Sequence, residues 1–439
     1  MKEINTDEIS NLSLHETPIP KSRRLPTGSS DPVSFTCACP ASLRGGGQVL
    51  LFYRYFASPP ALPTLNLSPE EISSLAAFHT SLTQKHSLGG KIRIAKEGFN
   101  ITVGGTNASI SAYISECISH WSFAGLDLES EQAQQEFFKP TPGGCACVFG
   151  GVPASVRVTS EITPMGVTNY LPSSWSNIEV LTPEEFHERC HTSPDVLLLD
   201  VRNYYESRIG YFVSPQTGEP AIRPAIRRFS QWPQYVKRYM TGSEQKKEVL
   251  TFCTGGIRCE KGARFLEEHM PESKVATLKG GIAGYLMWME AEIKAGRKKP
   301  EESLFKGRNF VFDARGSTTL GDEDGEPVAK CHLCKKSSNR LSKCRSKGCH
   351  LVLVICAGCE MEADPRCCQN CLDMDVLAHA DGELKEKTSR PICACEKERE
   401  AELWGGEYVK QPKTQKSRKG RENGVRGEND IDIRVKVID

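Results

Sequence analysis

The sequence predicts a mixed α/β protein that is built from several domains. The chain has 439 residues, more than the ~100 to 200 residues of one domain. In two stretches, short apolar runs typical of strands alternate with segments of helical periodicity. In addition, nine of the 19 cysteines fall within residues 331–371. We therefore expect an α+β domain at 48–165, an α/β domain with a parallel sheet at 177–316 and a small cysteine-rich unit at 328–375.

The first domain is predicted from the order of its elements. The apolar run 49–56 is typical of a buried strand, and Ser68 and Pro69 begin a helix with apolar residues at helical spacing through Leu82. Strands at 91–95 and 100–103, a helix at 108–118 and a strand at 155–158 follow. This order is the split βαβ, or ferredoxin-like (acylphosphatase-like), plan.

The second domain is predicted from three short apolar runs, at 196–199, 249–252 and 275–278, with helical patterns beside them. Alternating strands and helices form a parallel sheet that is covered on both faces. Ligands bind such sheets beyond the carboxyl ends of the strands. Cys253 directly follows the second run, so it is placed where we expect a site.

The net charge and the lengths of the apolar runs exclude some classes of protein. The 56 Lys and Arg residues against 55 Asp and Glu residues give a net charge of +1, so RNA affinity must be local and no DNA partner is expected. No apolar run reaches the roughly 18 to 20 residues that span a bilayer. We expect a flexible leader at 1–47 and a basic, disordered tail at 376–439.

The same features predict where the protein works. The N-terminus lacks the apolar segment of a secretory signal, so reduced thiols are favoured over disulfides. This indicates the cytoplasm. The chloroplast is the alternative, although the leader carries acidic residues that transit peptides avoid.

Cys253 is a candidate nucleophile because of the loop that follows it. A helix begins after this loop, and a helix start gathers free N–H groups and a positive dipole end that favour a thiolate. Arg258 could add a fixed charge, so it is predicted to share the catalytic site. The alternative is a buried structural cysteine, against which the glycine pair, the arginine and the helix start all argue. The active loop between Cys253 and Arg258 consists of Thr254, Gly255, Gly256 and Ile257.

Three polar residues lie at the end of the 196–199 strand and could support the loop. Asp200, Arg202 and Glu206 are expected mainly to anchor loops, with Arg202 and Glu206 spaced as an ion pair four residues apart. Cys259 lies six residues after Cys253. It is either a resolving thiol or a cysteine packed at the helix start.

These motifs carry a resemblance. Residues 198–202 with Glu206 resemble the strand-end motif of a rhodanese domain, and 253–258 resembles its six-residue active loop. More specifically, several stretches resemble the rhodanese-containing tRNA uridine hydroxylase family, with Phe99 where isoleucine is usual. These stretches are 90–100, 229–236, 253–261, 280–282 and 310–313. The cysteine-rich extension is most similar to that of eukaryotic, plant-like members.

The resemblance covers roughly 49–372 and implies a function. The family hydroxylates the wobble uridine (uridine 34) of tRNA, with molecular oxygen as co-substrate and with the equivalent of Cys253 essential. The loop alone also fits a sulfurtransferase, which would pass a Cys253 persulfide from a small sulfur donor to an acceptor. A zinc-dependent scaffold without catalysis is a third hypothesis, but the intact Cys253 argues against it.

A local basic segment is the candidate RNA surface. Arg223, Arg227 and Arg228 precede Trp232 and Tyr235, and cations beside aromatic rings suit phosphates and unpaired bases. The alternative is a solvated basic helix with aromatic residues in the core.

The cysteine-rich unit predicts structural zinc. Its thiols form four successive pairs, and four thiolates bind one Zn2+ tetrahedrally. We therefore expect two zinc ions. The sequence does not fix which pairs combine, and the preferred arrangement joins the first pair to the third and the second to the fourth. Cys367, His332 and His350 keep the ligand list open. The Cys-Ala-Cys pairs at 37/39, 145/147 and 393/395 are expected to be ordinary thiols. The predicted ligands are Cys331, Cys334, Cys344, Cys349, Cys356, Cys359, Cys368 and Cys371.

Overall fold

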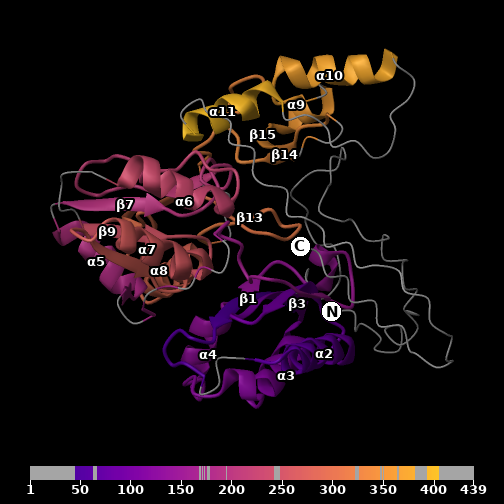
Figure 1. Ribbon diagram of the computed structural model, residues 1–439, viewed down its shortest axis with the longest axis vertical. Helices are drawn as coiled ribbons and strands as arrows, with labels where there is room; N and C mark the ends of the chain where they lie inside the picture. Colours follow the sequence, from indigo (N-terminus) through magenta and orange to yellow (C-terminus); the bar gives the residue numbers. More distant parts are fainter. Residues whose placement is uncertain are drawn as a thin grey trace, which may run out of the picture.

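The computed structural model arranges the chain in three tiers (Figure 1). The N-terminal domain, the parallel-sheet domain and the cysteine-rich extension follow one another in chain order. Nearly all of the predicted leader and the basic stretch 410–426 lie outside the described residues. The structure describes residues 45–62, 67–167, 170, 172, 174–175, 178–193, 195–241, 248–321, 326–346, 349, 351–362, 365–380 and 393–404. Within these ranges, no helix is both long enough and apolar enough to cross a membrane.

The N-terminal domain is a five-stranded sheet in the order β4-β1-β3-β2-β5. Its strands are β1 (Gly47–Tyr55), β2 (Gly89–Ala95), β3 (Gly98–Thr106), β4 (Thr141–Pro142) and β5 (Ser155–Val158). Its helices are α2 (Pro69–Lys85), α3 (Asn107–Ile118) and α4 (Glu131–Phe138). The predicted strands and helices are confirmed, and Ser68 caps α2 in a capping box with Glu71.

Two features of this sheet were not predicted. The strand β5 pairs in parallel with β2, while the two-residue β4 occupies the edge beside β1. Such a short strand shows no periodicity, so the sequence pattern could not reveal it. In addition, both faces of β1 are covered. Leu50 and Phe52 join the core beneath the helices, whereas Tyr53 and Tyr55 on the other face pack with Ile257 of the second domain.

The second domain contains the predicted parallel sheet, in the order β6-β10-β9-β7. Alternate residues of its strands enter two different cores, as expected for a sheet covered on both faces: Leu198 and Leu250 join one core, Leu199 and Val249 the other. The elements are β6 (Glu179–Leu181), α5 (Pro183–Thr192), β7 (Val196–Asp200), α6 (Trp232–Tyr235), β9 (Glu248–Phe252), α7 (Ile257–His269), β10 (Lys274–Leu278) and α8 (Gly281–Lys294).

Short antiparallel pairs lead from this sheet into the cysteine-rich extension. They are β8 (Gly210–Phe212) with β11 (Phe305–Gly307), β12 (Asn309–Phe310) with β13 (Ser317–Thr318), and β14 (Leu341–Lys343) with β15 (Val352–Val354). The helices of the extension are α9 (Ala357–Glu362), α10 (Gln369–Ala380) and α11 (Ala394–Trp404).

The expectation of a disordered tail from residue 376 onward is wrong for part of that segment. Residues 376–380 continue α10, and α11 packs against α6 of the parallel-sheet domain. Charge-rich composition concealed α11 because its stability comes from tertiary contacts more than from an apolar face of its own.

The start of α8 supports the loop after β9. Gly280 and Gly281 both have positive φ, at +72° and +62°. The amide of Ile282 donates to the carbonyl of Cys253 at 2.9 Å, and the amide of Ala283 donates to the carbonyl of Thr254 at 2.9 Å. A Cβ at Gly281 would lie 2.4 Å from the Cys253 carbonyl oxygen. The backbone of α8 can approach this closely only through glycine.

Gly281→Ala should therefore destabilise the protein and displace the loop. The positive φ costs about 1 to 3 kcal/mol for a residue other than glycine, and the clash with loop backbone adds to it. Gly296→Ala is the matched control, because Gly296 has φ +72° and a Cβ there would meet no atom of the described residues within 4 Å. Urea denaturation of both variants measures the difference in unfolding free energy. Equal losses would show that the contact with the Cys253 loop contributes nothing.

Candidate active site

The predicted strand, loop and helix meet at Cys253, which is fully buried. The amide of Gly256 donates to its Sγ at 3.2 Å. Gly256 has the expected positive φ, +100°, immediately before α7. At Gly255 the need for glycine is spatial, since a Cβ there would lie 2.8 Å from Cδ2 of Leu51 in β1. The loop thus folds its backbone around its own thiol.

Arg258 is held by Glu206 inside the domain. Its Nη1 and Nη2 donate to the two carboxylate oxygens of Glu206 at 2.6 and 2.7 Å. Nη2 also donates to the hydroxyl of Thr254 at 3.0 Å, and this hydroxyl donates to Glu206 at 3.1 Å. All three side chains are buried. The bidentate pair fixes the guanidinium beside the thiol loop and balances much of its charge.

The expected pair between Arg202 and Glu206 does not form, because each has a different partner. Arg202 binds Asp200, with Nη2 donating to Oδ2 at 2.7 Å, and it also donates to the carbonyl of Gly210 at 2.7 Å. Asp200 and Arg202 are fully shielded from solvent in this ion pair. The pair anchors the end of β7, which leaves Glu206 available to bind Arg258.

The surroundings of Cys253 favour the thiolate. Burial raises the pKa of this thiol, but the hydrogen bond from the Cys259 thiol, the charge of Arg258 and the amides of Cys259 and Arg258 outweigh burial and lower the pKa to about 6. For Cys259, burial and the bond to Cys253 raise the pKa well above its usual value. These opposite shifts favour Cys253 as the anion of the pair and Cys259 as its proton-bearing partner.

The N-terminal domain covers this site, which the sequence analysis did not anticipate. Tyr53 donates from its hydroxyl to Glu260 at 3.1 Å, and this hydroxyl would lie 2.7 Å from a Cβ at Gly256. Lys139, also buried, lies with its Nζ 5.7 Å from the Tyr53 ring centroid. Burial lowers the pKa of Lys139 to about 8, although the charge of Cys253 opposes this shift. One sequence feature could have predicted this cover. In β1, tyrosines with polar hydroxyl groups occupy alternate positions of an otherwise apolar strand, which indicates that the second face of the strand also packs against protein.

A second buried charge joins the domains. Lys261 of α7 contacts Glu97 at 2.8 Å and Glu161 at 2.6 Å. Glu97 lies in the 90–100 stretch that carries the family resemblance, and Lys261 ends the 253–261 stretch. The two stretches are thus in contact, although they are far apart in sequence.

The three candidate RNA-binding arginines differ in their surroundings. Arg223 and Arg228 are exposed, and the Arg223 guanidinium lies 4.5 Å from the ring centroid of Tyr211. Arg227 is partly buried, and its Nη1 lies 3.7 Å from Oε1 of Glu396 in α11. Arg223 and Arg228 remain candidates for phosphate contacts, whereas Arg227 already has an acidic neighbour.

The cysteine-rich extension brings its thiols together in the expected alternation. Cys331 and Cys334 meet Cys356 and Cys359, and the Cys344/Cys349 pair meets the pair at the start of α10. Cys334 and Cys356 are 3.6 Å apart between their sulfurs. Ligand atoms in each group lie within 4.8 Å of one another, which is compatible with four thiolates around one tetrahedral ion.

Three cysteine assignments differ from those expected. In the Cys-Ala-Cys pair at 145/147, Cys147 forms a disulfide bond and is not an ordinary thiol. The second group contains Cys367 with Cys371 and does not include Cys368. Cys368 instead lies in a third group with Cys367, Cys393 and Cys395, so the last Cys-Ala-Cys pair is not a pair of ordinary thiols. Adjacent side chains before a helix point in different directions, and sequence spacing alone cannot tell which one faces inward. His350 and the Cys-Ala-Cys pair at 37/39 lie outside the described residues.

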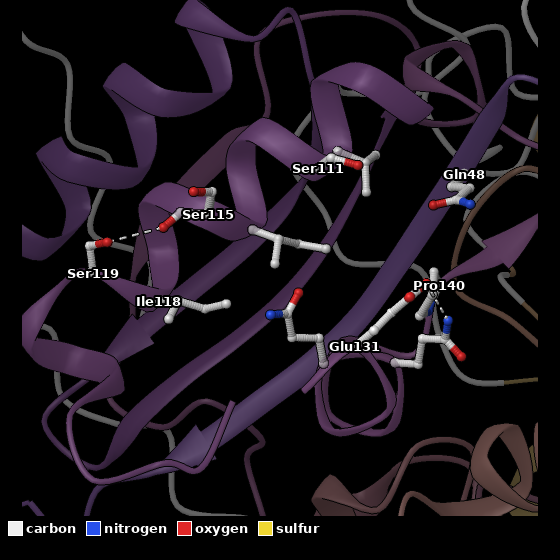
Figure 2. A pocket seen from close by; sticks show the side chains of 11 residues that line it. Gln48, Ser111, Ser115, Ile118, Ser119, Glu131 and Pro140 are labelled. Atoms are coloured by element: carbon white, nitrogen blue, oxygen red, sulfur yellow. Dashed lines mark hydrogen bonds between the residues drawn. The ribbon is translucent and has the colours of Figure 1, made fainter. Parts of the chain in front are cut away.

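A separate hollow of about 560 Å3 lies on the N-terminal domain between α3, α4 and β1 (Figure 2). It is lined by Gln48, Ile110, Ser111, Ile114, Ser115, Ile118, Ser119, Glu131, Gln134, Gln135 and Pro140. None of these residues belongs to the predicted site, so the hollow does not form part of it.

The lowered pKa of Cys253 predicts a pH profile. Below pH about 6 the neutral thiol predominates and above it the thiolate. The ultraviolet thiolate absorbance of the wild type minus that of Cys253→Ser should rise with a midpoint near that pH. A midpoint near the ordinary thiol value of about 8.5 would contradict the stabilisation by the loop.

Comparison with known proteins agrees with this architecture. Residues 47–141 match the family described as UPF0176 acylphosphatase like domain, and residues 306–372 match the family described as Rhodanase C-terminal. The chain is 29% identical over 368 residues to "Rhodanese-like domain-containing protein 6" of Arabidopsis thaliana, covering 79% of this chain and 58% of that protein. The chain thus spans little more than half the length of this plant relative.

Bacterial relatives are matched over more of their length. The similarity to "tRNA uridine(34) hydroxylase" of Sinorhizobium fredii is 34% identity over 248 residues, covering 56% of this chain and 68% of that protein. For the protein of the same name in Staphylococcus carnosus, the identity is 27% over 328 residues, covering 74% of this chain and 90% of that protein. On this similarity in sequence, the chain belongs to the tRNA uridine(34) hydroxylase family of rhodanese-domain proteins.

Proposed function

We propose that this protein hydroxylates uridine 34 of tRNA in an oxygen-dependent reaction that requires the Cys253 thiolate. The observation that carries the proposal is the intact, buried Cys253 loop, with a thiol pKa lowered to about 6, in a chain of this family. Such a thiol is ionised at neutral pH, and the thiolate is the reactive form of cysteine. Two observations therefore support the oxidoreductase hypothesis: the ionised thiol of Cys253 and the similarity of the chain to hydroxylases.

The surrounding residues have distinct roles in this proposal. The Gly256 amide and the Cys259 thiol stabilise the anion directly. Arg258 adds a positive charge whose position is set by Glu206 and Thr254, so Glu206 is a positioning residue. Asp200 and Arg202 support the site indirectly, because their ion pair holds the end of β7 in place.

The buried position of the Cys253 thiol means that the structure must open before a substrate can reach it. Cys253 has no exposed surface, because β1 lies over the loop through Leu51 and Tyr53. A uridine base reaches Sγ only when β1 and the loop separate. Flipping a base out of a stacked RNA loop is common among enzymes that modify bases, and here the protein would open as well.

Replacing Cys253 tests the reaction. In cells that lack the gene, the wild type should restore 5-hydroxyuridine at position 34, whereas Cys253→Ser should restore none, because an alcohol cannot supply the anion. Mass spectrometry of digested tRNA measures the modification. Cys190→Ser, at another buried cysteine, is the control for folding. Full modification by Cys253→Ser would overturn the assignment of the nucleophile.

The same experiment addresses the alternative, in which Cys253 passes a persulfide sulfur to an acceptor. A sulfurtransferase would leave the hydroxylation of tRNA unchanged between cells with and without the gene. Turnover of a small sulfur donor by the purified protein, lost in Cys253→Ser, would then support the alternative.

The tRNA surface is proposed to include Arg223 and Arg228, since both are exposed and Arg223 lies over the ring of Tyr211. Substituting both with alanine should flatten the slope of log affinity against log salt by about 0.7 to 0.9 for each lost phosphate contact. Arg227→Ala is the matched control and should change the slope less, because Arg227 lies beside Glu396. Filter binding at several salt concentrations gives the slopes. An unchanged slope in the double variant would exclude both residues from the RNA surface.

The first and second cysteine groups are proposed to hold one structural zinc each, as the spacing predicted. The buried thiols Cys331, Cys344 and Cys349 belong to a unit with few apolar residues, and units of this kind take much of their folding free energy from metal binding. Closely grouped reduced thiols also fit a reducing compartment such as the cytoplasm.

A further inference from the structure

Seven thiols at the far end of the extension form one continuous cluster. They belong to the second and third cysteine groups, which share Cys367. The cluster consists of Cys344, Cys349, Cys367, Cys368, Cys371, Cys393 and Cys395. Two of these residues are separated from the rest in sequence and enter the cluster at the start of α11.

Cys367 lies at the centre of the cluster. Its sulfur is 3.2 Å from that of Cys371 and 3.8 Å from that of Cys349 on one side. On the other side it is 3.6 Å from Cys393 and 3.5 Å from Cys395. Zn–S bonds of about 2.3 Å in a tetrahedron place sulfurs about 3.8 Å apart. A disulfide would bring two sulfurs to about 2.05 Å.

We propose that Cys368, Cys393 and Cys395 bind a third divalent metal ion, which shares the Cys367 thiolate with the metal of the second group. Seven ligands cannot surround one four-coordinate ion, but they suffice for two ions when one sulfur bridges them. A thiolate has lone pairs for both bonds. This proposal does not rest on the proposed function, because none of the seven thiols belongs to the candidate active site around Cys253.

Local structure offsets the charge of such a cluster. Two Zn2+ ions and seven thiolates would carry a net negative charge. The first residues of α10 and α11 both lie at the cluster. Helix starts present partial positive charge and free amides. The amide of Cys367 also donates to Sγ of Cys344 at 3.4 Å. The amide of Ala394 donates to Oδ1 of Asn370 at 3.0 Å, which joins the two helix starts.

The third ion would have a structural consequence for α11. An isolated helix of this length is marginal in water, and the metal would fix its first turn through Cys393 and Cys395. Once fixed, α11 packs on α6 and brings the buried carboxylate of Glu396 to Arg227. The third ion thereby links the extension to the parallel-sheet domain.

Metal content of the purified full-length protein tests the proposal. With zinc supplied during expression, elemental analysis and native mass spectrometry should give three ions per chain, one for each group if Cys367 is shared. Cys393→Ser/Cys395→Ser should lose one ion, and so should Cys368→Ser. Cys334→Ser/Cys359→Ser is the matched control, which should lose the ion of the first group instead. Wild-type protein with two ions, unchanged in Cys393→Ser/Cys395→Ser, would overturn the third site.

The bridge and the docking of α11 have their own measurements. In Co2+-substituted protein, a shared thiolate couples the two high-spin ions, so the paramagnetic resonance intensity per cobalt should be reduced and should recover in Cys393→Ser/Cys395→Ser. Full intensity in the wild type would exclude the bridge. Hydrogen exchange of 394–404 should accelerate in this variant and stay unchanged in Cys334→Ser/Cys359→Ser. Equal exchange in wild type and variant would contradict the anchoring of α11 by the metal.

Discussion

The close packing of the Cys253 loop between β1 and the start of α8 is the constraint on which the site depends. Leu51 lies against one glycine of the loop, and the Gly281 backbone lies directly behind the loop. The loop amides are therefore fixed toward the thiol, and water is excluded from it. In such a setting hydrogen bonds and charges act through a low dielectric, which strengthens them. The environment of the Cys253 thiol thus depends on residues from both domains.

Burial of this kind favours acidic or basic partners for the nearby charges, since an uncompensated buried charge costs about 3 to 5 kcal/mol. Arg258 is matched by Glu206, and Lys261 lies between Glu97 and Glu161. Because Glu206 balances much of the Arg258 charge, the arginine is only one of several influences on the thiol. The hydrogen bond from Cys259 is the larger contribution to the lowered pKa of Cys253.

The cysteine-rich extension reaches toward this network through neighbouring residues. Tyr204 packs against the cysteine core of the extension, and Tyr205 contacts Phe310 with ring centroids 5.4 Å apart. Both precede Glu206, which positions Arg258. Residues 204–206 therefore connect the extension with the residue that positions Arg258. This contact gives the extension a physical connection to the thiol without requiring it to touch substrate.

The main strands and helices could be predicted from the sequence, because local patterns of apolar residues mark them. The glycine pair before a helix start likewise made Cys253 the candidate nucleophile, which stays a prediction. The partners of the charged residues, such as Glu206 for Arg258, and the position of Tyr53 over the loop became known from the three-dimensional fold. It also decided that Cys367, and not Cys368, completes the second cysteine group. These choices depend on side-chain direction and on contacts between distant segments, and neither quantity is encoded in the spacing of residues along the chain.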